Sequence, residues 1–170
     1  MISNSVNEKM ISFKELEKKI FKYVCELGCE ITRSILEAYD DAVAVKRDKQ
    51  KYRNKGKRAT CIKTVYGSVK YQRRIYGTIT ENGEKAYVYL LDAEMRMDKI
   101  GMISSNLAEK IAMTVTESPY RVTAETISST SGQSISASGV WNVMQRLGEK
   151  ISEEEKYAVK QQTYHLYFPV

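Results

Sequence analysis

Residues 1–45 carry apolar side chains at steps of three and four, the spacing of a single stripe along an α-helix. A strand would need alternating apolar and polar residues, and that alternation is missing here. The pattern therefore predicts one long amphipathic helix over residues 1–45. The stripe consists of Phe13, Leu16, Ile20, Val24, Leu27, Ile31, Ile35, Ala38 and Ala42.

A stripe of this length has to lie on another apolar surface. The near-heptad spacing suits a coiled-coil partner, which would make the chain a homodimer through its N-terminal helix. Packing of the stripe against the rest of the same chain explains the pattern equally well. The sequence leaves both alternatives open.

The period changes to two after a charged run. Residues 59–77 read ATCIKTVYGSVKYQRRIYG and predict two strands joined at Tyr66-Gly67, since Val, Ile, Thr and Tyr favour strands. The segment KAYVYLL follows the turn signal Asn82-Gly83 and predicts a third strand. We therefore expect a basic arm plus a three-stranded antiparallel β-meander over residues 46–91, and a linker over residues 92–103.

Helical spacing returns in residues 104–151. Ser104 and Ser105 can cap a first helix, and Ser118 before Pro119 predicts a second helix with Ser118 as its N-cap. Residues 130–132, Thr-Ser-Gly, end that helix. Three helices separated by short breaks predict a helix-turn-helix-like domain, so the fold class is α+β.

The last of these helices begins at Ser136, with Ile135 and Val140 forming a hydrophobic staple across its start. Its predicted buried stripe is Val140, Met144, Leu147 and Ile151. Residues 152–170 are expected to form a tail. Small and polar residues off the stripe are candidates for contacts with DNA bases, since amides pair with adenine and guanidinium with guanine. They are Ser136, Ser138, Asn142, Gln145 and Arg146.

Charge is concentrated in one segment. The chain has a net charge of +6, but residues 46–76 hold twelve Lys and Arg and one Asp, a net of +11. Such local asymmetry is typical of a surface for a polyanion, although a merely solvated loop would look the same. The candidate contacts to the DNA backbone are Lys46, Arg47, Lys49, Lys51, Arg53, Lys55, Lys57, Arg58, Lys63, Lys70, Arg73 and Arg74.

The order of segments resembles a known family. A long helix containing FKYVCELGCEI leads into RDKQKYRNKGKR, then TCIKTVYGSVKYQRRIY, YVYLLD and SGQSISASGVWNVMQRLGEKI. This order is similar to the N-terminal part of the ISLre-type insertion-sequence transposases, over about residues 10–160. The resemblance implies a region that binds double-stranded DNA at the ends of the element and precedes a DDE-type catalytic domain, which would hold divalent metal ions.

The sequence itself offers no catalytic site and no metal site. No Asp or Glu follows Glu155, so we expect a chain truncated before the catalytic domain, without enzymatic activity or a cofactor of its own. Cys25, Cys29 and Cys61 lack the paired spacing of a zinc site, and an odd set of cysteines suits a reducing cytoplasm. Neither a membrane-spanning segment nor a secretory signal is visible.

Three other functions remain open at this stage. The chain could be an enzyme, either a nuclease or an assembled transposase, with catalytic acids that its sequence does not reveal. The chain could be a stand-alone DNA-binding regulator, or a relic that represses transposition. It could also be an RNA-binding or coiled-coil interaction protein whose arm binds RNA. Preference for duplex DNA over RNA separates the DNA-binding region of a transposase from this RNA-binding or coiled-coil protein.

Overall fold

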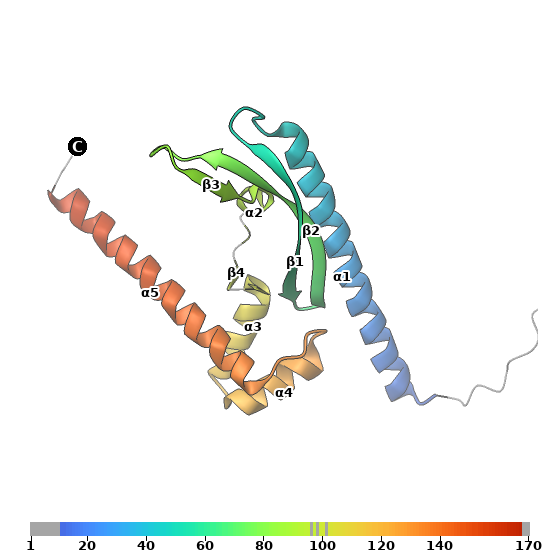
Figure 1. Cartoon of the computed structure of the whole chain (residues 1–170). Coiled ribbons are helices and arrows are strands. Elements are labelled where there is room, and N and C mark those ends of the chain that lie inside the picture. Colours follow the sequence, from blue (N-terminus) through green and yellow to red (C-terminus); the bar gives the residue numbers. More distant parts are fainter. Residues whose placement is uncertain (1–10, 96, 98, 101, 168–170) are drawn as a thin grey trace, which may run out of the picture.

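The computed structural model describes residues 11–95, 97, 99–100 and 102–167 of the 170-residue chain. A long helix lies along one side of a curled β-sheet, and three further helices pack at one end of that sheet (Figure 1). The predicted mixed α+β class with a long N-terminal helix is thereby confirmed.

Helix α1 spans Phe13–Lys46. A capping box fixes its start: Ser12 Oγ accepts a hydrogen bond from the Glu15 N–H, and the Glu15 carboxylate accepts one from the Ser12 N–H. Both helix-start donors are therefore satisfied by neighbouring side chains. Residues 1–10 of the predicted helix lie outside the described residues.

The face of α1 that packs on the sheet is not the predicted apolar stripe. The buried residues of α1 are Cys25, Leu36 and Asp40. By contrast, all nine stripe positions from Phe13 to Ala42 are exposed. Packing of the stripe on the same chain is therefore wrong within the part of the chain that the structure describes.

Strands β1 (Arg53–Thr64) and β2 (Gly67–Ile79) form the predicted hairpin, and β3 (Lys85–Val88) pairs antiparallel with β2. Two short strands, β4 (Lys99–Ile100) and β5 (Ile103–Ser104), extend the sheet on the other side of β1. The described residues thus form a five-stranded sheet in the order β3-β2-β1-β5-β4.

The expected three-stranded antiparallel meander is therefore wrong in two respects. The sheet has more strands, and β5 runs parallel to β1, with the Lys63 N–H donating to the Met102 carbonyl at 2.8 Å. Strands of two residues have no measurable period, so residues 92–103 were predicted only as a linker.

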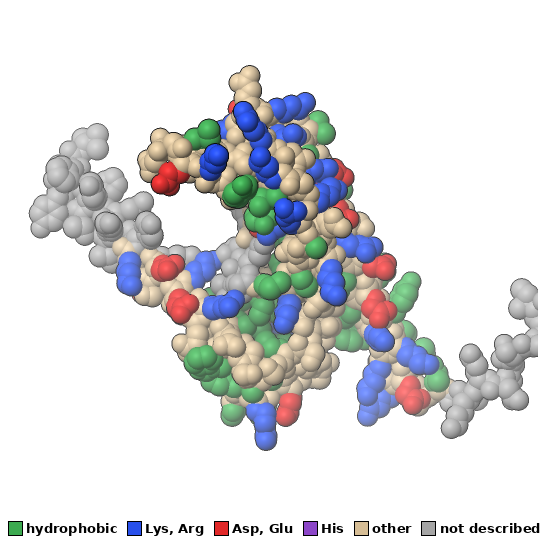
Figure 2. Space-filling model, in the orientation of Figure 1, with side chains coloured by type: hydrophobic (Ala, Val, Ile, Leu, Met, Phe, Trp, Pro, Cys, Tyr) green, Lys and Arg blue, Asp and Glu red, His purple; other side chains and the backbone are tan. Residues whose placement is uncertain are grey.

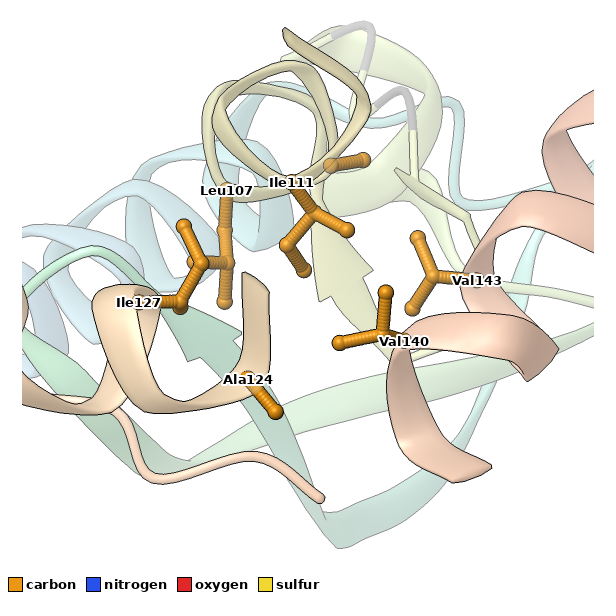
Figure 3. Packing of buried hydrophobic residues seen from close by; sticks show 7 residues of the cluster. Leu107, Ile111, Ala124, Ile127, Val140 and Val143 are labelled. Carbon is orange, nitrogen blue, oxygen red and sulfur yellow. The ribbon is translucent and has the colours of Figure 1, made fainter. Parts of the chain in front are cut away.

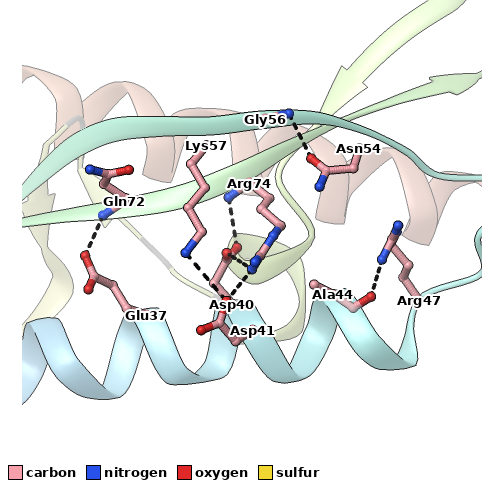
Figure 4. Close-up of polar contacts among 10 residues, drawn as sticks. All are labelled: Glu37, Asp40, Asp41, Ala44, Arg47, Asn54, Gly56, Lys57, Gln72 and Arg74. Atoms are coloured by element: carbon pink, nitrogen blue, oxygen red, sulfur yellow. Dashed lines mark hydrogen bonds and ion pairs between the residues drawn. The ribbon is translucent and has the colours of Figure 1, made fainter.

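Helix α1 covers the open edge of β2. Strand β3 pairs only with the second half of β2. Along the first half, the N–H groups of Gln72 and Arg74 donate to carboxylates of Glu37 and Asp40 at 3.0 and 2.9 Å (Figure 4). These side chains satisfy backbone groups that would otherwise offer an edge to another strand.

A first hydrophobic core lies between α1, the hairpin and the short helix α2 (Leu90–Glu94). Leu36 and Leu91 reach it from the two helices, and both are buried. The hairpin contributes Ile62, Val69 and Tyr71. This core fixes the sheet against α1 and leaves the opposite end of the hairpin free to carry charged side chains.

A second core joins α3 (Ser105–Val115), α4 (Tyr120–Thr130) and α5 (Ala137–Tyr167). Figure 3 shows how the side chains of the three helices converge. The cluster consists of Leu107, Ala108, Ile111, Ala124, Ile127, Val140 and Val143. The helical domain predicted from residues 104–151 therefore has its own buried centre.

Details of these helices differ from expectation. The Ser118 hydroxyl donates to the Thr114 carbonyl at 2.9 Å and bonds the Thr123 hydroxyl at 3.0 Å, so Ser118 extends the end of α3 rather than capping α4. In α5, Val143 is buried and Ile151 is exposed, and the helix continues past the predicted end at residue 151. Ser136 does accept the N–H of Gly139, at 3.1 Å, as an N-cap does.

The helical block meets the hairpin at Gly132. Its N–H donates to the Val65 carbonyl at 2.9 Å, and a Cβ added there would lie 1.8 Å from the Tyr66 carbonyl oxygen. Beside it, Gln133 is buried and its Oε1 accepts a hydrogen bond from the Ser68 hydroxyl at 2.9 Å. The segment GQSIS therefore holds two parts of the fold together.

Candidate nucleic-acid interface

We call residues 46–76, which carry the net charge of +11, the basic run. It begins at the last residue of α1, passes through a short turn and continues into the β1–β2 hairpin. Asp48, its one acid, accepts the N–H groups of Gln50 and Lys51 at 2.8 and 3.1 Å and closes that turn. Lys49 and Lys51 are exposed beside it. The predicted arm is thus a short turn followed by a strand that already belongs to the sheet.

A β-bulge alters the direction of the cations along β1. The register with β2 shifts between Asn54 and Lys57. Gly56, between them, has a φ of 97°, and its N–H donates to Asn54 Oδ1 at 2.8 Å (Figure 4). A bulge interrupts the alternation of side chains and twists the strand. Lys55, Lys57 and their neighbour Arg58 are all exposed there.

A cleft of about 320 Å³ lies where the basic run meets β2 and β3. We call it the basic cleft, after the four cationic residues that line it: Lys51, Arg53, Lys55 and Lys85. The remaining lining residues are neutral: Gln50, Gly77, Thr78, Ile79, Ala86 and Tyr87. Among its described lining residues the pocket has cations and an aromatic ring but no carboxylate, which suits an anionic ligand.

Gly77 gives Lys55 its place in the basic cleft. A Cβ on Gly77 would lie 3.0 Å from Cε of Lys55, so the glycine lets the lysine stem cross β2 closely. Gly77 pairs with Arg53 on one side and with Tyr87 on the other. The three strands therefore bring cations from the run and from β3 together.

Arg74 was predicted to contact the DNA backbone, and the structure places it elsewhere. Its guanidinium lies 2.7 Å from Asp40 Oδ2 and 2.6 Å from Asp41 Oδ1 (Figure 4). The hydrogen bond from Arg74, and next the charge of Lys57, hold the pKa of Asp41 below its usual value. Arg74 is neutralised by acids of α1 and is withdrawn from the candidate set.

Arg73 is also paired with an acid. It forms an ion pair with Asp92, and its guanidinium stacks on the Tyr89 ring at 3.8 Å from the centroid. The side chain is only 11% exposed. Arg73 therefore ties α2 to the sheet and exposes little surface to a ligand, and its contact with DNA stays a prediction.

Arg47 is engaged in part. Its guanidinium donates to the Ala44 carbonyl and, at 3.3 Å, to the Tyr52 carbonyl, and it lies 5.4 Å from the Tyr76 ring centroid. These contacts close the end of α1 over the sheet. Arg47 is half-buried, so its charge contributes to the local potential more than to direct contact.

The other predicted backbone contacts are exposed. They are Lys46, Lys49, Lys51, Arg53, Lys55, Lys57, Arg58, Lys63 and Lys70. In Figure 2, Lys and Arg side chains gather over the upper part of the molecule, where α1 ends and the sheet begins. Lys57 also lies 3.6 Å from Asp41, an exposed pair that water and salt screen.

The candidates for base contacts lie on α5. Asn142, Gln145 and Arg146 are exposed. The Ser136 hydroxyl lies 3.1 Å from that of Ser138. The start of α5 is at the opposite end of the view from the turn between α1 and β1 (Figure 1). The structure therefore separates the two predicted groups of DNA contacts.

Sequence reasoning missed three exposed or cleft-lining residues. Lys85 and Tyr87 line the basic cleft because β3 pairs with β2. The turn at Asn82-Gly83 and the third strand were predicted, so their register could have indicated both. Trp141 is 47% exposed on α5, one residue before Asn142; a hydrophobic residue on the exposed face of a helix gives no pattern of its own.

In the described part of the chain, His, Cys, Asp and Glu side chains form no group of three or more that could hold a metal ion. Cys25, Cys29 and Cys61 are free thiols, and burial, followed by the neighbouring cysteines, raises the pKa of Cys29. Among the helices of the described residues, none has the length and apolar character needed to cross a bilayer.

The model of an uncharacterised protein family, UPF0236, matches residues 6–167. No curated protein and no solved structure matches the chain.

Proposed function

The chain belongs to the uncharacterised protein family UPF0236, and we propose that it binds duplex DNA through the basic cleft and the exposed cations around it. The observation that carries this proposal is the cleft itself, with Lys51, Arg53, Lys55 and Lys85 in its wall and no acid among the residues described there. Ammonium and guanidinium groups that line one surface neutralise phosphates and release counterions. Binding of this kind depends steeply on salt and little on sequence.

The placement of the acids supports the same proposal. Three carboxylates beside the run already have partners: Asp48 in the turn, Asp40 at Arg74 and the edge of β2, and Asp41 at Arg74 and Lys57. The exposed lysines and arginines therefore face solvent with little competition. A merely solubilising surface would not need a bulge or a cleft that gathers cations from the turn before β1, from β1 and from β3.

The order of segments that resembles the N-terminal part of ISLre-type transposases supports a narrower version of this proposal. In that version the chain is the DNA-binding region of an insertion-sequence transposase, and the duplex is the end of the element. A stand-alone regulator of the same element would bind the same duplex. The nucleotide sequence downstream separates the two, because a continued reading frame for a catalytic domain marks a transposase.

The test is a titration of the full chain with a fluorescent duplex at several salt concentrations. If about six phosphates are neutralised, the logarithm of the binding constant falls against the logarithm of salt with a slope of roughly −5. Replacing Lys51, Arg53 and Lys55 with Ala should make that slope shallower by roughly three and weaken binding to all duplexes alike. Replacing Lys85 alone should change it by about one.

A control separates the cleft from net charge. The triple variant Arg33→Ala, Arg121→Ala and Lys156→Ala removes the same charge from exposed sites outside the cleft. Its slope should stay close to that of the unaltered chain. If the two triple variants change the salt slope equally, the proposal is wrong. Tighter binding to a matched RNA duplex would show that the cleft prefers RNA.

A further inference from the structure

Helix α1 has two distinct long faces. One packs on the edge of β2 through Cys25, Leu36 and Asp40. The other carries the apolar stripe, and none of its nine residues is covered by the described chain. The exposed fractions of its large members run from 39% at Leu16 to 73% at Phe13.

The stripe is regular over its whole length. Its eight steps run three, four, four, three, four, four, three and four residues, so the stripe follows an 11-residue repeat. Phe13, Val24 and Ile35 begin the three repeats. Eleven residues in three turns give 3.67 residues per turn, close to the 3.6 of an α-helix, so the stripe stays on one side of a nearly straight helix. A surface helix with no partner needs no such regularity.

The exposed apolar surface is wider than the stripe. Phe21, Tyr23 and Tyr39 flank it and are 46%, 66% and 51% exposed. An apolar surface of this extent on a solvent-exposed face of a helix is typical of a protein interface.

Charge along α1 points to the orientation of a partner helix. The first part of the helix is basic, with Lys14, Lys18, Lys19 and Lys22 against two glutamates. Apart from the buried Asp40, the later part carries the acids Glu26, Glu30, Glu37 and Asp41 against Arg33 and Lys46, so it is still acidic. A second α1 in the antiparallel direction sets basic against acidic halves, whereas a parallel copy sets like charges together.

Side-chain size points the same way. The stripe begins with the large residues Phe13 and Leu16 and ends with the small residues Ala38 and Ala42. In an antiparallel pair centred near Leu27, each large end lies against a small end, so the helices can stay at one distance along their length. In a parallel pair, large residues would crowd together at one end, and the small residues at the other end would leave the two helices out of contact.

We propose that the stripe on α1 binds a second copy of this chain in the antiparallel direction, with the two-fold axis near Leu27. The same surface serves both subunits, as a two-fold interface requires. In each subunit, the sheet stays packed on the face of α1 that lies opposite the stripe. The two basic clefts then lie toward opposite ends of the helix pair.

Sedimentation equilibrium of the full chain tests the association. The expected mass is twice the 19.5 kDa of one chain. Leu27→Glu places two carboxylates together near the axis and should raise the dissociation constant on the order of 100-fold, with an unchanged circular dichroism spectrum. Met113→Glu puts the same charge on a 72% exposed residue of α3 and should leave the dimer intact.

Cross-linking tests the direction. Antiparallel pairing brings residue 20 of one chain near residue 35 of the other. A chain with Ile20→Cys, mixed with a differently tagged chain with Ile35→Cys, should form disulfides between unlike chains on mild oxidation, and the unaltered chain controls for Cys25, Cys29 and Cys61. A monomer, a dimer that survives Leu27→Glu, or disulfides mainly between like chains would each overturn the proposal.

Discussion

Arg74 binds Asp40 twice: its backbone N–H donates to Oδ1 at 2.9 Å and its guanidinium to Oδ2 at 2.7 Å. The Asp40 side chain is almost completely buried, and its two oxygens join α1 to the unpaired edge of β2. The Asp40 carboxylate thereby accepts a backbone hydrogen bond that a neighbouring strand would otherwise accept. It also neutralises an arginine that would otherwise add to the basic surface.

Asp40→Ala should therefore destabilise the fold strongly. It leaves a backbone donor and a mostly buried guanidinium without this acceptor, and breaking such a pair costs about 3–5 kcal/mol. Urea denaturation followed by circular dichroism measures the change. Asp41→Ala is the control, because Asp41 binds the same guanidinium from an exposed position and should matter much less. Similar losses in both variants would contradict the role assigned to Asp40.

Gly132 should not tolerate even one methyl group. A Cβ there would meet the Tyr66 carbonyl at 1.8 Å, which backbone movement alone can relieve. We expect Gly132→Ala to cost about 3 kcal/mol or more, at the upper end of overpacking penalties. Gly148→Ala in α5 meets no atom within 4 Å and should stabilise by about 0.5–1 kcal/mol through helix propensity. Thermal unfolding of the two variants measures both effects. We expect the unfolding temperature to fall for Gly132→Ala and to rise for Gly148→Ala.

The sequence predicted elements well where the periodic segments were long. The stripe from Phe13 to Ala42 indicated α1, and the alternation around Tyr66 indicated the β1–β2 hairpin. The same stripe did not reveal which face of α1 packs on the sheet, because the packing face is made of small and polar residues such as Cys25 and Asp40. A pattern shows that a surface is apolar, and only the tertiary fold shows what covers it.

The candidate site was predicted less completely, for a related reason. Local charge indicated the basic run, and nine of its twelve cations are exposed. Arg73 and Arg74 looked alike in sequence, yet their acids come from α2 and α1, and those from α1 lie more than thirty residues away. Lys85 enters the basic cleft through strand pairing, which charge counting along the chain does not register.

Asp41 should make stability depend on acid pH. Its pKa is lowered in the folded chain by Arg74 and then Lys57. Its contribution is therefore present above the ordinary Asp pKa of about 3.9 and is lost as the pH falls through the lowered folded value. The difference in urea midpoint between the unaltered chain and Asp41→Asn should shrink between pH 6 and pH 3. High salt should reduce it at pH 6 as well, since the side chain is exposed. A difference that grows toward low pH would exclude this pair as its source.

The last prediction concerns which residues read DNA sequence. Asn142 and Gln145 are exposed on α5, away from the core formed by Val140 and Val143, so their amides are free to pair with a base edge. A duplex selected from a random pool provides a preferred sequence, and its scrambled version provides the comparison. Asn142→Ala should cost about 1–3 kcal/mol on the selected duplex and almost nothing on the scrambled one.

Two further variants serve as controls for Asn142→Ala. Lys55→Ala should weaken both duplexes equally, because phosphate contacts position a protein without reading its sequence. Asn106→Ala, an exposed asparagine on α3, should change neither. If Asn142→Ala weakens both duplexes alike, or changes neither, α5 does not read bases. The helical block would then act by holding the hairpin in place through Gly132 and Gln133, and the basic cleft would bind DNA without sequence preference.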